Sequence, residues 1–387
     1  MPKKVSSALR YEIGPIRPPN EAYSLLVRLT RNCPWNRCEF CHVYKGKRFE
    51  RRAVADIKKD IDTIRKIRDV IVDLSLKKGH GGAVTEGFLE RIYSDPGHSE
   101  YVKSVAVWLY FGGRNVFLQD ANSLVMKVDD LVESLTYLKE TFPCIERITS
   151  YARAQTIAQL WTVDNLKRLK EAGLTRLHLG LESGLDDLLR LIRKGVTKGQ
   201  QIEAGTRVKT SGVELSEYVV PGLGGRTWWR DHALETADTL NRINPDFIRL
   251  RTLKVTRDMP LYKTIESGEL ELQTDDEILE EIKLFVETLD VTSAIKSDHI
   301  LNLLEEIDGK LPEDKGKILS VIDRFHALDE EQKVVYRFGR RAGMYRSLDD
   351  LDDQVTYFRI KKTMHQMEEQ EPGSVERQLS RLLDTYI

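Results

Sequence analysis

Three of the four cysteines in this chain lie within nine residues of one another. Cys33, Cys38 and Cys41 have the spacing C-x4-C-x2-C. Thiolates favour soft metals, so three of them on one short segment indicate a metal centre rather than a disulfide framework. Three thiolates can hold three irons of a four-iron four-sulfur cluster and leave the fourth iron open to another ligand.

A zinc site is the alternative, with His42 as the fourth ligand beside the three cysteines. Adjacent Cys41 and His42 cannot easily both reach one tetrahedral ion, which disfavours zinc. His42 is then expected beside the metal-binding loop or at the surface. The fourth cysteine, Cys144, stands alone after Pro143 and is expected to be a buried small apolar residue.

The composition is that of an ordinary globular protein. The 387 residues include 60 Lys and Arg against 61 Asp and Glu, for a net charge of −1. No global field would concentrate polyanions, which argues against a dedicated nucleic-acid-coating protein but allows a local basic patch. No run of 18 apolar residues and no signal-like start is present, so we expect a cytoplasmic protein without a membrane partner.

Short apolar segments alternate with helix-length segments through most of the chain. A long helical pattern covers Arg51–Lys77, and the glycine-rich stretch Gly79–Gly82 ends it. Six strands of a parallel sheet are predicted at Tyr23–Thr30, Asn115–Asp120, Ile145–Tyr151, Thr175–Glu182, Val213–Val220 and Asp246–Leu253. Six such α/β units with right-handed crossovers can curl into a partial (β/α)6 barrel.

Three regions are predicted along the chain. Residues 1–20 form an arm punctuated by prolines, and residues 21–258 form the barrel. Residues 259–387 are rich in Glu, Lys and Leu and are expected to be an all-helical extension. A loop at Asp298–Asn302 interrupts this extension and is a candidate lid over the barrel.

The cysteine loop directly follows the first predicted strand, at the strand end where the loops of a β/α barrel converge. In this the chain resembles the radical S-adenosylmethionine (SAM) enzymes, over about residues 20–255. The resemblance implies a [4Fe-4S] cluster on Cys33, Cys38 and Cys41, with SAM on the fourth iron. Phe40 matches the aromatic residue that lies near the SAM adenine. The usual spacing is C-x3-C-x2-C, so this chain has one extra residue in the first gap.

A second segment strengthens the resemblance. Residues 177–184 and 192–197 resemble the fourth strand and next helix of oxygen-independent coproporphyrinogen oxidase and the methylthiotransferases. By that match Glu182 holds the SAM ribose hydroxyls, and Arg193 or Lys194 holds the SAM carboxylate. The alternative is an ordinary surface glutamate and a basic helix end.

The same resemblance suggests ligands for the SAM ammonium group after the second strand. Gln119, Asp120 and Asn122 carry the carboxylate and amide oxygens that a cation needs. They would also be unremarkable as turn residues. On the third strand, Ser150 or Tyr151 occupies the analogous position, with a packed tyrosine as the alternative.

On the fifth strand this chain departs from the family pattern. Leu215 stands where an acidic residue is usual, six residues before Pro221. Because side chains alternate along a strand, Glu217 lies on the same face as Leu215. Glu217 is therefore the candidate for the missing carboxylate.

The sixth strand carries two arginines on one face. Helices cover the outside of such a barrel, so Arg249 and Arg251 are expected to be buried inside and to need anionic partners. Those partners are either a substrate carboxylate or phosphate, or the barrel carboxylates Glu217 and Asp120. His299 and Asn302, on the candidate lid, are expected either to touch substrate or to cap a surface turn.

The resemblance implies that SAM is cleaved reductively to a 5′-deoxyadenosyl radical, which abstracts hydrogen from an anionic substrate, a small molecule or a macromolecule. It also implies a low-potential electron donor such as flavodoxin or ferredoxin. No cobalamin-binding domain is recognised before the barrel, and no second cysteine cluster is present. The alternative function is a non-catalytic iron–sulfur, haem-handling or RNA-binding protein on the same fold.

Overall fold

The computed structural model describes residues 9–384, which divide into two compact units. Unit 1 runs to Asn36 and includes residues 43–179 and 206–215. Unit 2 comprises residues 37–42, residues 180–205 and the chain from Ser216 onward. The cysteine loop therefore contributes to both units, with Cys33 in unit 1 and with Cys38 and Cys41 in unit 2.

The sheet of unit 1 is parallel throughout. Its strands, in spatial order, are β1 (Leu25–Arg28), β4 (Asn115–Gln119), β5 (Arg147–Ala152) and β6 (Arg176–Glu182), the last of which ends in unit 2. Leu25 pairs with Val116, and Val116 pairs in turn with Ile148. Most residues of these strands are buried on both faces, which is why they read as continuous apolar runs in the sequence.

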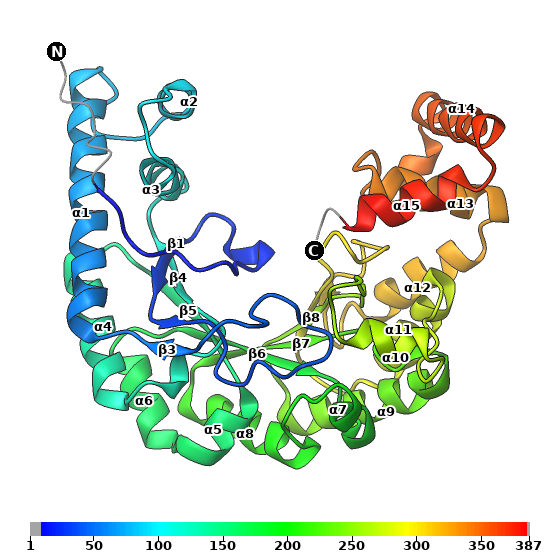
Figure 1. Ribbon diagram of the computed structural model, residues 1–387, viewed down its shortest axis with the longest axis horizontal. Helices are drawn as coiled ribbons and strands as arrows, with labels where there is room; N and C mark the ends of the chain where they lie inside the picture. The colour runs from blue at the N-terminus through cyan, green and yellow to red at the C-terminus, as the bar shows by residue number, and fades with distance from the viewer. Residues whose placement is uncertain (1–8, 385–387) are drawn as a thin grey trace. The chain divides into compact units, whose positions relative to one another are not determined.

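Helices cover the strands of unit 1 on one side, where α1, α4 and α6 pack in series (Figure 1). Helix α1 buries a stripe of isoleucines spaced three or four residues apart, from Ile57 to Ile71, which is the pattern of an amphipathic helix. The helices of unit 1 are α1 (Val54–Lys77), α2 (Glu86–Ser94), α3 (Glu100–Tyr110), α4 (Val128–Thr141), α5 (Ala154–Leu160) and α6 (Val163–Glu171). Short elements are η1 (Pro19–Glu21), β2 (Thr30–Arg31), β3 (Glu50–Arg51) and η2 (Ser123–Val125).

Unit 2 contains the strand order β7-β8-β9-β10. Strands β7 (Glu214–Val219), β8 (Phe247–Leu250) and β9 (Ala294–Lys296) are parallel, and β10 (Gly309–Lys310) is antiparallel to β9. Its helical elements are α7 (Asp186–Leu191), α8 (Lys198–Ser211, shared with unit 1), α9 (Gly225–Ile243), α10 (Leu261–Glu266), α11 (Asp275–Thr288), α12 (Lys315–His326), α13 (Glu330–Arg341), η3 (Leu348–Asp352), α14 (Gln354–Gln370) and α15 (Ser374–Asp384).

The predicted fold class is confirmed, because parallel strands alternate with helices as a partial (β/α)6 barrel requires. The expectation of an all-helical chain after residue 258 is wrong at β9 and β10. Both strands are two or three residues long, and only Ile295 in β9 is fully buried. Segments this short cannot display the alternation that marks a strand in a sequence.

Several candidate residues lie at the carboxyl ends of strands. Asp120 directly follows β4, and Glu182 is the last residue of β6. Among residues 9–384, no helix combines the length and the apolar content that crossing a membrane requires.

Candidate functional site

The second half of the cysteine loop packs within unit 2 against the turn after α7. Glu39 donates its backbone N–H to the carbonyl of Ile192 at 2.9 Å, and its own carbonyl accepts from Leu261 N–H at 3.0 Å. The Glu39 side chain lies 3.0 Å from Nε of Arg193. Three contacts thus fix the segment that separates Cys38 from Cys41, and both cysteines are half-buried.

Phe40 on this segment faces an ion pair at the end of β6. Nζ of Lys194 lies 5.7 Å from the centre of the Phe40 ring and 2.6 Å from Oε1 of Glu182. Only 9% of Glu182 and of Lys194 is exposed. A buried pair of this kind offers one acceptor and one donor of opposite charge, which can face the two ends of a zwitterion.

The backbone at this pair is in an uncommon conformation. Glu182 and Arg193 have φ angles of 62° and 49°, the left-handed region that residues with a Cβ rarely adopt. Gly180 leaves the space that the pair fills, because a Cβ there would lie 2.2 Å from Oε1 of Glu182 and 2.8 Å from Nζ of Lys194. Such backbone conformations persist where the surroundings hold them.

Part of that support is a buried histidine on α9. Nε2 of His232 lies 3.2 Å from the carbonyl oxygen of Glu182, which also accepts from Val220 N–H at 3.1 Å. Nδ1 of His232 lies 3.0 Å from Oε1 of Glu281, and the same oxygen accepts from Gly222 N–H at 3.0 Å. The sequence offered no signal for His232 or Glu281, since each is one of many polar residues in its helix.

Glu217 on β7 completes the charged group. Burial raises its pKa well above the usual 4.5, and the nearby Glu182 carboxylate raises it further, while Lys194 opposes both effects. Glu217 is 2% exposed, and this burial favours its neutral form more than in a free glutamate. The group thus contains one ion pair and a second carboxyl group with a raised pKa, which can donate a hydrogen bond when it is protonated.

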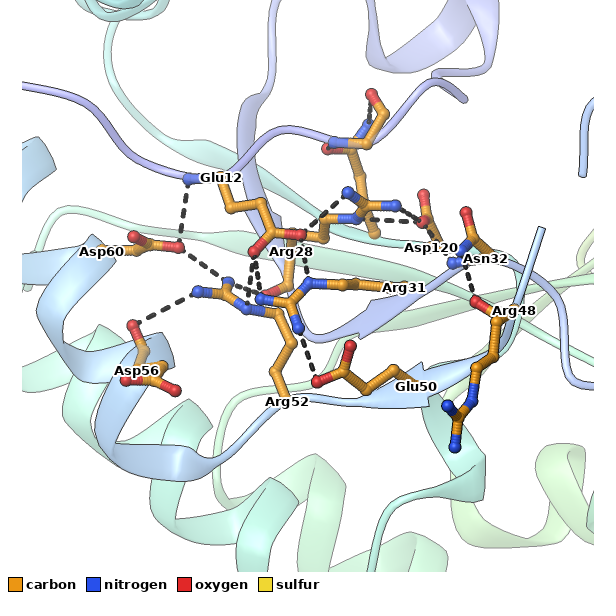
Figure 2. Close-up of polar contacts among 12 residues, drawn as sticks. Glu12, Arg28, Arg31, Asn32, Arg48, Glu50, Arg52, Asp56, Asp60 and Asp120 are labelled. Atoms are coloured by element: carbon orange, nitrogen blue, oxygen red, sulfur yellow. Dashed lines mark hydrogen bonds and ion pairs between the residues drawn. The ribbon is translucent and has the colours of Figure 1, made fainter.

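In unit 1, Asp120 anchors the start of the cysteine loop. One of its carboxylate oxygens, Oδ2, accepts from Nε of Arg28 at 3.0 Å and from the backbone N–H of Asn32 at 2.9 Å (Figure 2). Asn32 has a φ of 67° and directly precedes Cys33. The other oxygen, Oδ1, has no hydrogen-bond partner among the described residues.

The other predicted ligands in unit 1 are engaged by the chain itself. Gln119 accepts from Gly14 N–H at 2.8 Å and donates to the carbonyls of Gly14 and Ile16. Asn122 donates to the Thr156 hydroxyl at 2.8 Å, and the Ser150 hydroxyl donates to the carbonyl of Tyr151 at 3.2 Å. These bonds are those of structural polar residues.

The arginines of the sixth strand, β8, differ from each other. Nη1 of Arg249 lies 2.6 Å from Oδ2 of Asp298, and Arg249 is 5% exposed, as expected for a buried guanidinium. The expectation that Arg251 is buried is wrong, because it follows the last residue of β8 and is exposed. Arg249 therefore pairs with neither of the carboxylates expected from the sequence.

The loop at Asp298–Asn302 has a largely structural set of contacts. Asn302 accepts from Thr252 N–H at 2.8 Å and donates to the carbonyl of Leu250 at 2.8 Å. Burial, reinforced by the nearby Arg251, lowers the pKa of His299 to about 4. His299 is therefore neutral at physiological pH.

Two further expectations concern the lone cysteine Cys144 and the alternative zinc site. Cys144 is exposed, so the expectation of a buried residue is wrong; its thiol lies 3.4 Å from the carbonyl of Gly113. Within the described part of the chain, no three Cys, His, Asp or Glu side chains come close enough to hold a single metal ion. This holds for the three cysteines of the loop as well as for the set with His42, so it favours neither an iron–sulfur cluster nor zinc.

Comparison with known proteins bears on the family. A model of the radical SAM superfamily matches residues 99–238. The resemblance to the radical SAM superfamily is thereby confirmed. This family uses a [4Fe-4S] cluster and SAM as cofactors. The matched radical SAM residues begin after the cysteine loop, so the assignment of the three thiols rests on their spacing and on their place after β1.

Individual relatives of this chain are distant. It is 26% identical over 140 residues to tRNA uridine(34) acetyltransferase of Methanocaldococcus infernus, which is 36% of this chain and 24% of the relative. The match to the Methanocaldococcus jannaschii protein of the same name is 25% over 142 residues, and covers 35% of this chain and 24% of that one. The chain thus spans about a quarter of the length of these curated relatives.

Among solved structures, coproporphyrinogen III oxidase from Escherichia coli aligns with a TM-score of 0.44 at 14% identity, over 68% of this chain and 52% of that chain. The archaeal Methanocaldococcus infernus Elp3 aligns with a TM-score of 0.41 at 16% identity, over 55% of this chain and 54% of that chain.

Proposed function

We propose that this chain is a radical SAM enzyme that binds a [4Fe-4S] cluster through Cys33, Cys38 and Cys41 and abstracts hydrogen from an anionic substrate. When bound, the cluster and SAM supply one chemistry: one electron cleaves SAM to methionine and a 5′-deoxyadenosyl radical. The electron comes from a low-potential donor of the ferredoxin or flavodoxin class. The abstracted hydrogen ends in 5′-deoxyadenosine.

One observation carries the proposal: Phe40, between two of the cysteines, lies against the buried Glu182–Lys194 pair. The residues fit the cofactors, because soft thiolates suit iron–sulfur clusters and a zwitterion needs an acceptor and a cation. Glu182 would accept hydrogen bonds from the ribose hydroxyls, and Lys194 would hold the SAM carboxylate. A non-catalytic iron–sulfur protein would need the cysteines but not this pair.

The remaining candidate ligands have unequal support. Glu217 is buried beside the Glu182–Lys194 pair, so it would donate or accept a hydrogen bond from SAM there. Arg193 is held at Glu39 and would steady the loop rather than reach SAM. Gln119, Asn122 and Ser150 already bond within the chain, so of the candidates in unit 1 Asp120 would offer the SAM ammonium an oxygen, Oδ1, that has no hydrogen-bond partner among the described residues.

The substrate is proposed to be anionic because of Arg251. Its exposed guanidinium is available to a carboxylate or phosphate, whereas Arg249 already pairs with Asp298. His299, near Arg251, would offer the substrate a neutral imidazole. Asn302 would hold the loop in place. The curated relatives are named for an activity on tRNA, so RNA is the first anionic class to test.

Anaerobic reconstitution tests the proposal directly. We expect about four irons per chain, the number in a cubane cluster, and loss of most of that iron when all three cysteines are changed to alanine. Reduced protein with SAM should release 5′-deoxyadenosine slowly without substrate. Release of only S-adenosylhomocysteine or methylthioadenosine would overturn the proposal. Incubation with deuterated cell extract then identifies the donor by deuterium in 5′-deoxyadenosine.

A further inference from the structure

The cysteine loop leaves and rejoins unit 1 through a short neck, formed by β2 (Thr30–Arg31) and β3 (Glu50–Arg51). The strands are antiparallel, with Thr30 opposite Arg51 and Arg31 opposite Glu50. A two-stranded ribbon is marginal in water even when it is longer than this. The neck therefore needs support from elsewhere if it is to hold residues 32–49 in one position.

That support comes from the N-terminal arm, through the carboxylate of Glu12. Arg31 in the neck donates to both of its oxygens, from Nε to Oε1 and from Nη2 to Oε2, each at 2.7 Å (Figure 2). Nη1 of Arg28 lies 2.9 Å from Oε1, and Nε of Arg52 lies 3.2 Å from Oε2. Bidentate, charge-assisted bonds of this kind set geometry as well as adding energy.

Glu12 is itself held in place. Its backbone N–H donates to Oδ2 of Asp60 at 3.2 Å, and two residues further along Gly14 N–H donates to Gln119 at 2.8 Å. The hydrogen bond from Arg31 lowers the pKa of Glu12, so its carboxylate is charged at neutral pH. The arm thus presents a fixed anion to the neck.

The three arginines depend on Glu12 to different degrees. Arg52 also pairs with Asp60 at 2.7 Å, and Arg28 also pairs with the fully buried Asp120. Besides Glu12, Arg31 has an ion pair with Glu50, whose side chain is 58% exposed. Removal of the Glu12 charge would therefore weaken mainly the neck, because exposed pairs contribute little.

A second route leads from Glu12 to the first cysteine. Glu12 contacts Arg28, which contacts Asp120, and Asp120 accepts the backbone N–H of Asn32, the residue before Cys33. Asn32 also closes the loop from within, because its side-chain amide donates to the carbonyl of Arg48 at 2.6 Å. Figure 2 shows these residues in one continuous network.

We infer that Glu12 is a positioning residue, which latches the neck of the cysteine loop to the N-terminal arm and so restrains the loop for cluster binding. The inference rests on the proposed function, because it takes the loop to be the one that binds the cluster. It adds a role for the arm through Glu12, whose carboxylate pairs with Arg28, Arg31 and Arg52.

The test compares Glu12→Gln with Glu133→Gln in the full chain. Glu133 forms an ion pair with Lys58 that links α4 to α1 in the same unit. Glu133→Gln therefore makes the same chemical change at an ion pair that does not include a residue of the neck. Without iron, trypsin should cut the loop at the exposed Lys47 and Arg48 about 5- to 30-fold faster in Glu12→Gln, the factor expected for one to two kcal/mol. After reconstitution, iron should be lost to a chelator faster by a similar factor.

The outcomes separate the inference from the proposed function. Equal cutting and equal iron loss in Glu12→Gln and Glu133→Gln would overturn the latch. A wild-type chain that takes up no iron would overturn the proposed function, while the trypsin experiment would still test the latch. If Glu12→Gln fails to fold, Arg31→Lys keeps the charge but loses the two-pronged bond, and it should show the same faster loop cutting. A lower melting temperature with unchanged loop cutting would assign Glu12 a purely structural role and overturn the inference.

Discussion

Nζ of Lys194 lies 2.6 Å from Oε1 of Glu182, although 12 residues separate them in the sequence. Both side chains are nearly buried, and a third group, Glu217, whose pKa is raised by burial, lies beside them. Removal of one partner from such a pair leaves the other charge without compensation, which is the costly change. This relationship supports separate predictions for stability and for SAM binding.

Lys194→Met should lower the free energy of unfolding by about 3–5 kcal/mol, the cost of breaking a buried pair. The double variant Glu182→Gln, Lys194→Met leaves no buried charge of the pair and should regain most of that loss. Neither variant should bind SAM as the wild type does. Denaturant unfolding and equilibrium SAM binding measure the two effects. Full SAM affinity in the double variant would contradict the assigned role.

Gly180→Ala should distinguish the effect of the ion pair on SAM binding from its effect on stability. The added Cβ would overlap the ends of two flexible side chains, which can shift together and keep their ion pair, so the cost to folding should be small. We expect a melting temperature close to that of the wild type and SAM affinity about 10-fold weaker, equivalent to about 1.4 kcal/mol. Gly199→Ala is the control, because its Cβ would meet only the Thr197 hydroxyl, at 3.9 Å. Equal SAM affinity in both variants would count against the assignment of the pair.

Glu217→Gln should make the stability of the chain less dependent on pH. The folded pKa of Glu217 is raised, so the folded chain keeps a proton that the unfolded chain releases above about pH 4.5. Wild-type stability therefore falls as pH rises above that value. The variant lacks this loss and should melt at a higher temperature at pH 7, by roughly 2–4 °C for each 1 kcal/mol. The difference should vanish below about pH 4, as calorimetry at both pH values can show.

The sequence was sufficient to predict the parallel strands and to single out Glu182 and Lys194, but not their direct contact. Buried parallel strands read as apolar runs, and a carboxylate at a strand end followed by a cation one helix later is a local pattern. Long-range partners could not be predicted in this way. Nothing in the sequence indicates that Glu12 meets Arg31, or that Gln119 bonds to the arm, because both contacts depend on where the arm runs.

The sequence also failed to predict which side chains are exposed where a strand begins or ends. The alternation along β8 predicts the same face for Arg249 and Arg251, yet the strand ends at Leu250 and Arg251 is exposed. Cys144 was expected to be buried on its residue type alone, but it lies in the exposed turn before β5. A one-residue difference in where a strand begins or ends decides such cases, and sequence patterns locate strand ends poorly.

Substitution of Arg249 should accordingly affect stability, whereas substitution of Arg251 should affect substrate binding. Arg249→Met removes a charged hydrogen bond to Asp298 and should lower the free energy of unfolding by about 1.5–3 kcal/mol, whereas Arg251→Met should change it by less than about 0.5 kcal/mol. If Arg251 binds the anionic substrate, Arg251→Met should reduce deuterium transfer from cell extract about 10-fold, the effect of about 1.4 kcal/mol. Its release of 5′-deoxyadenosine without substrate should match the wild type, because Arg251 would contact neither SAM nor the cluster. An Arg251→Met protein that transfers deuterium normally would leave the proposed substrate without its anion-binding residue and would end that part of the proposal.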